Sequence, residues 1–187
     1  MISFEHPVTR LSPPESKIAL FRDLFRGRDD IFPRRFENRK TGKSGYQPAC
    51  ANEWVRGLCD KRAVKCAECP NRRFIAITNE TIRHHLSGKD ESGHDFVMGL
   101  YPMLRDEACY LLAADFDKKS WFDDVRSVRE TCLQLGLCPA LERSRSGNGG
   151  HLWFFFETAI PAVLARKLGA HILTETMERR PDIGIVC

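Results

Sequence analysis

The sequence predicts an α+β fold in which a mixed or antiparallel sheet carries flanking helices. Residues 109–116 form a nearly continuous apolar run, which is typical of a central strand buried on both faces. After residue 96, strand candidates alternate with segments of helical spacing. Hydrophobic residues make up 42% of the 187 residues, which supplies enough apolar surface for one domain with a small appended module.

The first half of the chain contains two helix candidates. Residues 12–15 (SPPE) resemble a capping box, and they precede apolar residues at helical spacing that end before Gly27. Residues 28–49 are rich in Arg, Lys, Gly and Pro, and we expect strand fragments and loops there. Asn79 is expected to cap a short second helix that ends near Gly88.

The second half begins with strands expected at residues 96–101 and 109–116. Ser120 is expected to cap a helix that ends at Gly136, because two aspartates in its first turn complement the helix dipole. The inner face of this helix is expected to carry Phe122, Val125, Val128, Cys132 and Leu135.

Two more strands and a long helix are expected in the remainder of the chain. The strands are predicted at residues 139–144 and 151–156, and the helix at residues 161–180. The residues expected to face inward from this helix are Leu164, Leu168 and Ile172.

Charge divides the chain into two regions. Residues 1–90 contain 18 Lys and Arg against 11 Asp and Glu, whereas residues 91–187 contain 11 against 14. The basic first region suits a polyanionic partner, and the second concentrates carboxylates that could hold cations. No apolar run approaches the length of a membrane span, and the N-terminus shows no secretory pattern, so we expect a cytoplasmic protein with no membrane partner.

Four of the eight cysteines crowd into residues 50–69 with the spacing C-x8-C-x6-C-x2-C. Without an export signal a disulfide framework is not expected, and four thiolates close the tetrahedral shell of a structural Zn²⁺. The alternative is four unrelated thiols. The expected zinc ligands are Cys50, Cys59, Cys66 and Cys69, and the flanking cations that could hold a phosphate backbone are Arg56, Lys61, Arg62, Lys65, Arg72 and Arg73.

Two carboxylates, Asp115 and Asp117, end the apolar strand. Because side chains alternate along a strand, both are expected on one face, roughly 7 Å apart, with Phe116 on the other. Such a pair can hold divalent cations such as Mg²⁺ or Mn²⁺ for phosphoryl transfer. The alternative is a strand that runs out into solvent with polar residues at its tip.

A basic, glycine-rich turn joins the next two strands. Glycines let a backbone approach closely, and Ser, Arg and backbone N–H groups can receive phosphate oxygens. The alternative is a flexible hairpin with a chance histidine. The candidate nucleotide-binding residues are Arg143, Ser144, Arg145, Ser146, Gly147, Asn148, Gly149 and His151, which opens the following strand.

Together these motifs resemble the archaeo-eukaryotic primase superfamily. The segment AADFD (residues 113–117) resembles its first motif, and SGNGGH (residues 146–151) resembles its second. The chain is most similar to the primase domain of TOTE conflict systems over about residues 20–180. The stretches that carry this similarity are LFRGR, TGKSGY, PACANEWVRGLC, CAECPNR, LAADFDK, LERSRSGNGGHLWFFF and ILTETMERR.

The resemblance implies an N-terminal zinc-binding region at residues 1–90, followed in the chain by an RRM-like catalytic core at residues 91–187. It implies template-directed, metal-dependent nucleotidyl transfer from nucleoside triphosphates to single-stranded or primer-template nucleic acid. Asp115 and Asp117 would be metal ligands, and His151 would contact the nucleotide. It also implies a superfamily II helicase as a partner or fused neighbour.

One feature departs from the superfamily pattern. The third motif is a further acidic residue on a later strand, but only Asp182 follows the last predicted helix here. We therefore expect a C-terminally truncated member that is incomplete as a catalyst by itself. Two alternatives remain: a non-catalytic, zinc-containing nucleic-acid-binding module, and a nuclease that uses Asp115 and Asp117. The nuclease leaves the glycine-rich turn and His151 unexplained.

Overall fold

The computed structural model describes residues 7–38, 40–117 and 119–179. The chain divides between Pro102 and Met103 into two compact units, each described separately below. The boundary expected at residues 90 and 91 lies inside the first unit. The segment after it returns to the N-terminal hairpin, where the N–H of Arg35 donates to the carbonyl oxygen of Val97.

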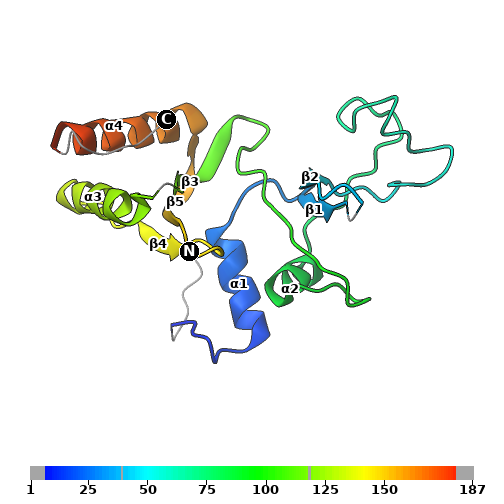
Figure 1. The fold of residues 1–187 in the computed structure, drawn as a ribbon, viewed down its shortest axis with the longest axis horizontal. Helices are drawn as coiled ribbons and strands as arrows, with labels where there is room; N and C mark the ends of the chain where they lie inside the picture. The colour runs from blue at the N-terminus through cyan, green and yellow to red at the C-terminus, as the bar shows by residue number, and fades with distance from the viewer. Residues whose placement is uncertain (1–6, 39, 118, 180–187) are drawn as a thin grey trace. The chain divides into compact units, whose positions relative to one another are not determined.

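The first unit combines two helices with a hairpin (Figure 1). An antiparallel hairpin forms from β1 and β2, and the two helices pack against each other. The elements are α1 (Pro14–Leu24), β1 (Pro33–Glu37), β2 (Ser44–Pro48) and α2 (Asn79–Ser87).

Both helices of this unit start beside the expected capping residue. Pro13 is the N-cap of α1, and the hydroxyl of Ser12 instead accepts the N–H of Thr9. Thr78 caps α2, one residue before the expected Asn79. Its hydroxyl accepts the N–H of Thr81, and the Thr81 hydroxyl accepts the N–H of Thr78, so a second threonine takes the place of the usual glutamate in a capping box.

The strand expected at residues 96–101 does not form. This segment makes a single antiparallel bridge, between Met98 and Arg34, and the N–H of Gly99 donates to the carbonyl oxygen of Pro33. Phe96 and Met98 of this segment are nevertheless buried, because the segment lies across the core instead of extending a sheet. The buried apolar residues of this core are Ile18, Phe32, Ala49, Ile82, Phe96 and Met98.

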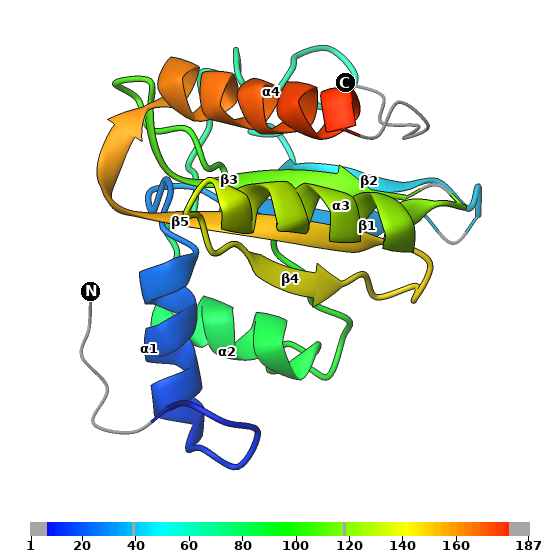
Figure 2. The same ribbon diagram turned by 90° about the vertical axis from the view of Figure 1, so that its left-hand side faces the viewer.

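The second unit is a three-stranded antiparallel sheet with two helices, which confirms the α+β class. The strand order is β3-β5-β4, so β5 pairs with both neighbours (Figure 2). Consequently β3 and β4 run parallel to each other with β5 between them. The elements are β3 (Ala108–Phe116), α3 (Trp121–Gln134), β4 (Ala140–Arg143), β5 (Gly150–Pro161) and α4 (Ala162–Arg179).

Helices α3 and α4 cover the same face of this sheet (Figures 1 and 2). Leu152 and Phe154 of β5 point into the core beneath them, so the alternate residues His151 and Trp153 face the other way. The buried core residues are Phe116, Val125, Val128, Cys132, Leu152, Phe154 and Ile172. The second face of the sheet therefore carries Asp115 of β3, Glu142 of β4 and His151 of β5.

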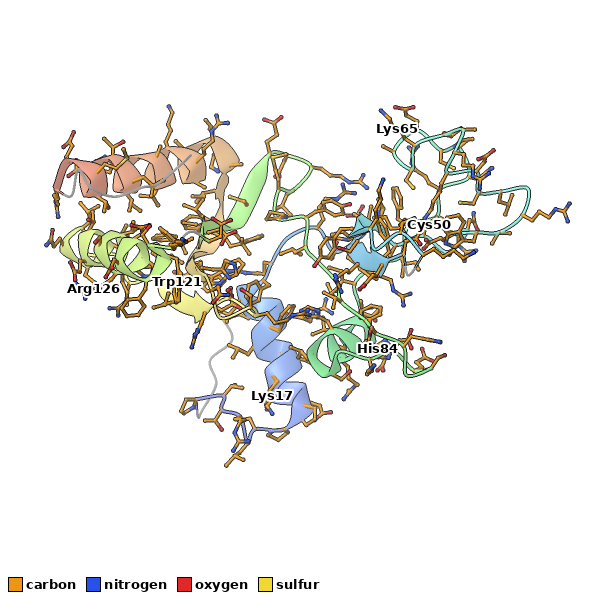
Figure 3. All side chains as sticks on the ribbon, in the orientation of Figure 1. Lys17, Cys50, Lys65, His84, Trp121 and Arg126 are labelled. Atoms are coloured by element: carbon orange, nitrogen blue, oxygen red, sulfur yellow. The ribbon has the colours of Figure 1, made fainter. Side chains whose placement is uncertain are left out.

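Three predicted core positions are wrong. Phe122 of α3 and Leu135, the C-cap residue of that helix, are 60% and 39% exposed, and Leu164 of α4 is 52% exposed. Trp121 packs against the core in place of Phe122, and Figure 3 labels this side chain at the start of α3. The predictions that hold are Val125, Val128, Cys132, Leu168 and Ile172.

The last helix begins one residue later than the expected position 161, because the strand β5 extends to Pro161 and α4 starts at Ala162. Among the described residues, no helix is both long and apolar enough to cross a membrane.

The half-buried imidazole of His85 on α2 lies in an environment that disfavours its charged form. Burial lowers the pKa of the His85 imidazole below its ordinary value. The N–H of Met98 donates to Nδ1 of His85 over 3.3 Å, which requires that nitrogen to be unprotonated. The folded state therefore favours neutral His85.

We predict that the free energy of unfolding falls as the pH is lowered below about 6.5, because the unfolded chain then binds a proton that folded His85 resists. The loss should continue until the pH reaches the lower pKa of the folded state. His85→Asn, whose side-chain oxygen can still accept the Met98 N–H, should flatten this dependence in urea unfolding measured from pH 5 to 8. The control His171→Asn, at an exposed position on α4, should leave it unchanged. An equal slope in wild type and His85→Asn would contradict the assignment.

Candidate functional site

Asp115 and His151 are direct cross-strand partners on the sheet face opposite the helices. Nε2 of His151 lies 3.3 Å from Oδ1 of Asp115. The Asp115 side chain is 68% exposed and the His151 side chain 29% exposed, so solvent reaches the pair. The structure thus brings together a carboxylate and an imidazole that are 36 positions apart in the chain.

Glu142 completes this row of polar side chains and was missed by the sequence analysis. It is the cross-strand partner of His151 on β4, and its Oε2 lies 3.3 Å from Nδ1 of His151. The indole N–H of Trp153 donates to the same oxygen over 2.7 Å. Counting back from the turn could have found Glu142, because Arg143 and Gly150 close the hairpin and place residue 142 opposite residue 151.

Asp117 lies one residue beyond the end of β3 and is exposed. Phe116, between the two aspartates, is 6% exposed and packs into the core under α3 and α4. The carboxylate of Asp115 therefore projects from the face opposite Phe116, as the alternation predicts.

The glycine-rich turn is held by its own hydrogen bonds. The N–H of Ser144 donates to the carbonyl oxygen of Gly149, and that of Gly147 donates to the carbonyl oxygen of Ser144, both over 2.9 Å. Gly147 has a φ of 78°, in the left-handed region that favours glycine. The Arg143 guanidinium donates from two nitrogens to the Gly147 carbonyl oxygen, at 3.1 and 3.0 Å. In this structure Arg143 therefore serves the framework of the turn.

Polar groups remain at the surface of the turn. The hydroxyls of Ser144 and Ser146 lie 3.1 Å apart, and the Ser146 hydroxyl accepts the N–H of Asn148. Arg145 is exposed at the tip. The turn thus presents hydroxyls and a guanidinium, groups that bind phosphate oxygens.

Gly149 fixes the distance between this turn and the end of β3. A Cβ on Gly149 would lie 2.7 Å from the carbonyl oxygen of Phe116 and 3.6 Å from Cα of Asp117. Only a residue without a side chain permits this approach. The glycine therefore places the turn directly against the aspartate-bearing strand end.

The carboxylates of Asp115 and Asp117 suit a hard divalent cation, but the part of the chain that the structure describes forms no complete metal site. Within the described ranges, no group of three or more His, Cys, Asp or Glu side chains is arranged to hold a metal ion. Asp115 and Asp117 are exposed, and ionised carboxylates supply the oxygen ligands that Mg²⁺ and Mn²⁺ prefer. The chemistry of these donors therefore fits the predicted cation.

The cysteines occupy a long loop between β2 and α2. Its base is closed by a bridge between Cys50 and Phe74, and the N–H of Ala51 donates to the carbonyl oxygen of Arg73. The N–H of Arg73 also donates to Sγ of Cys50 over 3.3 Å. Figure 3 shows Cys50 beside the hairpin and Lys65 farther out along the loop. All four thiols are half-buried and free, and their donor type fits Zn²⁺.

Two of the six basic residues in this loop stabilise the loop itself. Nζ of Lys61 lies 2.6 Å from Oε1 of Glu53 and 4.5 Å from the centre of the Trp54 ring. The Arg72 guanidinium donates to the carbonyl oxygens of Ala67 and Cys69. The exposed cations that remain at the surface are Arg56, Arg62, Lys65 and Arg73.

The second unit is an α+β domain whose sheet carries this row of polar residues on the face opposite the helices. A scan against family models matches residues 16–187 to the family described as TOTE conflict system, Archaeo-Eukaryotic Primase domain. The chain belongs to this family, which confirms the resemblance seen in its motifs. A search of curated proteins finds no match.

We predict that Gly149→Ala lowers the free energy of unfolding by about 1–3 kcal/mol, because its Cβ would meet a backbone oxygen that cannot move aside. Gly169→Ala in α4 is the matched control. There the new Cβ meets only the end of the Leu112 side chain, and alanine favours the helix, so stability should be unchanged or raised. Urea unfolding of both variants checks this. Equal stability of Gly149→Ala and wild type would contradict the close approach.

Proposed function

We propose that this chain is a primase-type nucleotidyltransferase domain that acts on nucleoside triphosphates and nucleic acid with a divalent cation. Membership of the primase family supports this proposal. The single observation that carries it is the pairing of Asp115 with His151 on the sheet face opposite the helices. A cation-binding carboxylate and a phosphate-binding imidazole then share one surface.

Asp115 and Asp117 would hold Mg²⁺ or Mn²⁺. When bound, the cation would neutralise triphosphate charge and polarise the reacting phosphorus–oxygen bond. Asp115 is suited to this role because its backbone is fixed in the sheet while its carboxylate is exposed. Asp117 is placed by the contact between the strand end and Gly149.

His151 and the glycine-rich turn would bind the phosphates. Nε2 of His151 contacts Asp115 in this structure, and it could donate to a phosphate oxygen beside that carboxylate. The hydroxyls of Ser144 and Ser146 and the exposed Arg145 lie on the same hairpin. Because the turn is already ordered by internal hydrogen bonds, little conformational entropy would be lost on binding.

The cysteine loop would hold a structural Zn²⁺ through Cys50, Cys59, Cys66 and Cys69, and its exposed cations would contact a phosphate backbone. These cations also favour a second candidate, a non-catalytic nucleic-acid-binding module. Asp182, the only acidic residue after the last predicted helix, lies outside the described residues. A superfamily II helicase partner stays a prediction.

We predict that Asp115→Asn and His151→Ala each weaken Mn²⁺-dependent nucleotide binding by at least about tenfold, because each removes a proposed contact to cation or phosphate. Isothermal titration with a non-hydrolysable triphosphate measures this. The controls are Asp123→Asn and His171→Ala, at exposed positions on α3 and α4.

Unchanged affinity in both site variants would reject the proposed pocket. If the wild-type chain binds single-stranded DNA but no nucleotide, the nucleic-acid-binding module replaces the primase-type function. Primer synthesis on a single-stranded template, measured in parallel, reports whether this chain carries out the transfer by itself.

We predict that the purified protein contains about one zinc per chain and that Cys66→Ser combined with Cys69→Ser removes it, because two of four ligands are lost. Elemental analysis by mass spectrometry measures the metal content. Cys138→Ser, at an exposed cysteine outside the loop, is the control and should retain the metal. A wild-type protein without zinc, or a double variant that keeps it, would contradict the proposed site.

A further inference from the structure

Glu142 lies at the centre of a hydrogen-bonded row on β4 and β5. One of its carboxylate oxygens, Oε2, is 3.3 Å from Nδ1 of His151 and accepts the indole N–H of Trp153 over 2.7 Å. The opposite nitrogen of the imidazole, Nε2, faces Asp115. The imidazole is therefore held between two carboxylates on neighbouring strands.

Trp153 is in turn fixed by its neighbours along β5. Its ring is nearly parallel to that of Phe155, with 7° between the planes and 6.4 Å between the centroids. On its other side it meets the His151 ring edge-on, with centroids 5.8 Å apart. Because an indole can only donate a hydrogen bond, the position of the ring determines where the Glu142 oxygen lies.

The chemistry of these groups sets the orientation of the histidine. An ionised carboxylate only accepts hydrogen bonds, so the contact to Glu142 places a hydrogen on Nδ1 of His151. The ring cannot then turn over without losing that bond. Nε2 is left as the nitrogen that faces Asp115 and the proposed phosphate position, and it donates to a phosphate oxygen only when it carries a hydrogen as well, as in the imidazolium form.

Direct metal binding by Glu142 together with Asp115 does not fit the topology. The two residues lie on β4 and β3, with β5 between them. The imidazole of His151 lies between their carboxylates, with Nε2 3.3 Å from Asp115 and Nδ1 3.3 Å from Glu142, so the two carboxylates do not meet around one cation in this arrangement. Glu142 therefore acts on the site through His151.

We infer that Glu142 is a positioning residue, which orients the His151 imidazole toward the nucleotide and is itself held by the indole of Trp153. This inference rests on the proposed function for the role of His151. It assigns a task to Glu142 and Trp153, which no motif identified.

The test uses the whole chain and three variants. Glu142→Ala removes the acceptor, Glu142→Gln keeps an oxygen that can accept the Nδ1 hydrogen, and Trp153→Phe keeps an aromatic ring without the N–H. Glu130→Gln, at an exposed glutamate on α3, is the control. The first readout is the ¹⁵N signal of the His151 ring, assigned with His151→Ala. The second is Mn²⁺-dependent affinity for a non-hydrolysable triphosphate.

In the wild type the His151 signals should show a hydrogen on Nδ1. Glu142→Ala should shift the Nδ1 signal toward the unprotonated position and weaken nucleotide binding by about tenfold or more, by analogy with the 10–100-fold losses when the hydrogen-bond partner of a metal-ligating histidine is removed. Glu142→Gln should restore most of both properties. Trp153→Phe should produce a smaller change in the same direction, and Glu130→Gln no change.

The outcomes separate the two proposals. If Glu142→Ala leaves the His151 signals unchanged, or weakens binding without altering them, the positioning role is overturned. It is likewise overturned if His151→Ala weakens nucleotide binding and Glu142→Ala does not. If His151→Ala has no effect on nucleotide binding, the proposed function fails, while the ¹⁵N signals still report whether Glu142 orients the ring.

Discussion

The antiparallel register of β5 between β3 and β4 is the constraint on which the site depends. It places Asp115 and Glu142 on either side of His151. Packing of Leu152 and Phe154 under the helices holds the register, because a slip by one residue would turn these apolar side chains to the opposite face. The same slip would carry the polar row into the core. Core packing and site geometry are therefore two consequences of one strand pairing.

The fixed geometry of the site continues beyond the sheet into the glycine-rich turn. Gly149 allows the turn to lie against the end of β3, and the Arg143 guanidinium closes the turn from within. The groups of the turn that we propose to bind phosphate are thus held in place by the turn's own hydrogen bonds, and side chains such as Arg145 lie at the surface. A preorganised turn beside an exposed carboxylate is suited to a charged ligand that brings its own cation.

Sequence reasoning succeeded where a local pattern carried the information. Alternation placed Asp115 opposite Phe116, and the hairpin signal brought His151 to the same sheet. It missed Glu142, because the role of this residue depends on register between strands and no motif marks it. It also placed Phe122 inside, since helical spacing alone cannot tell that the neighbouring Trp121 occupies the core. Zinc binding by the cysteine loop stays a prediction, since the described thiols form no complete ligand set.

The central claim is that the end of β3 and the start of β5 form one cation-and-phosphate site. Titration of Mn²⁺ into histidine-labelled protein tests it directly, because the unpaired electrons broaden the NMR signals of nearby nuclei. The account predicts that the His151 signal broadens at the lowest Mn²⁺ concentrations, while the signal of the exposed His171 on α4 stays sharp. It also predicts that Asp115→Asn removes the broadening of the His151 signal. A His151 signal that stays sharp while others broaden, or broadening that survives Asp115→Asn, would contradict the account.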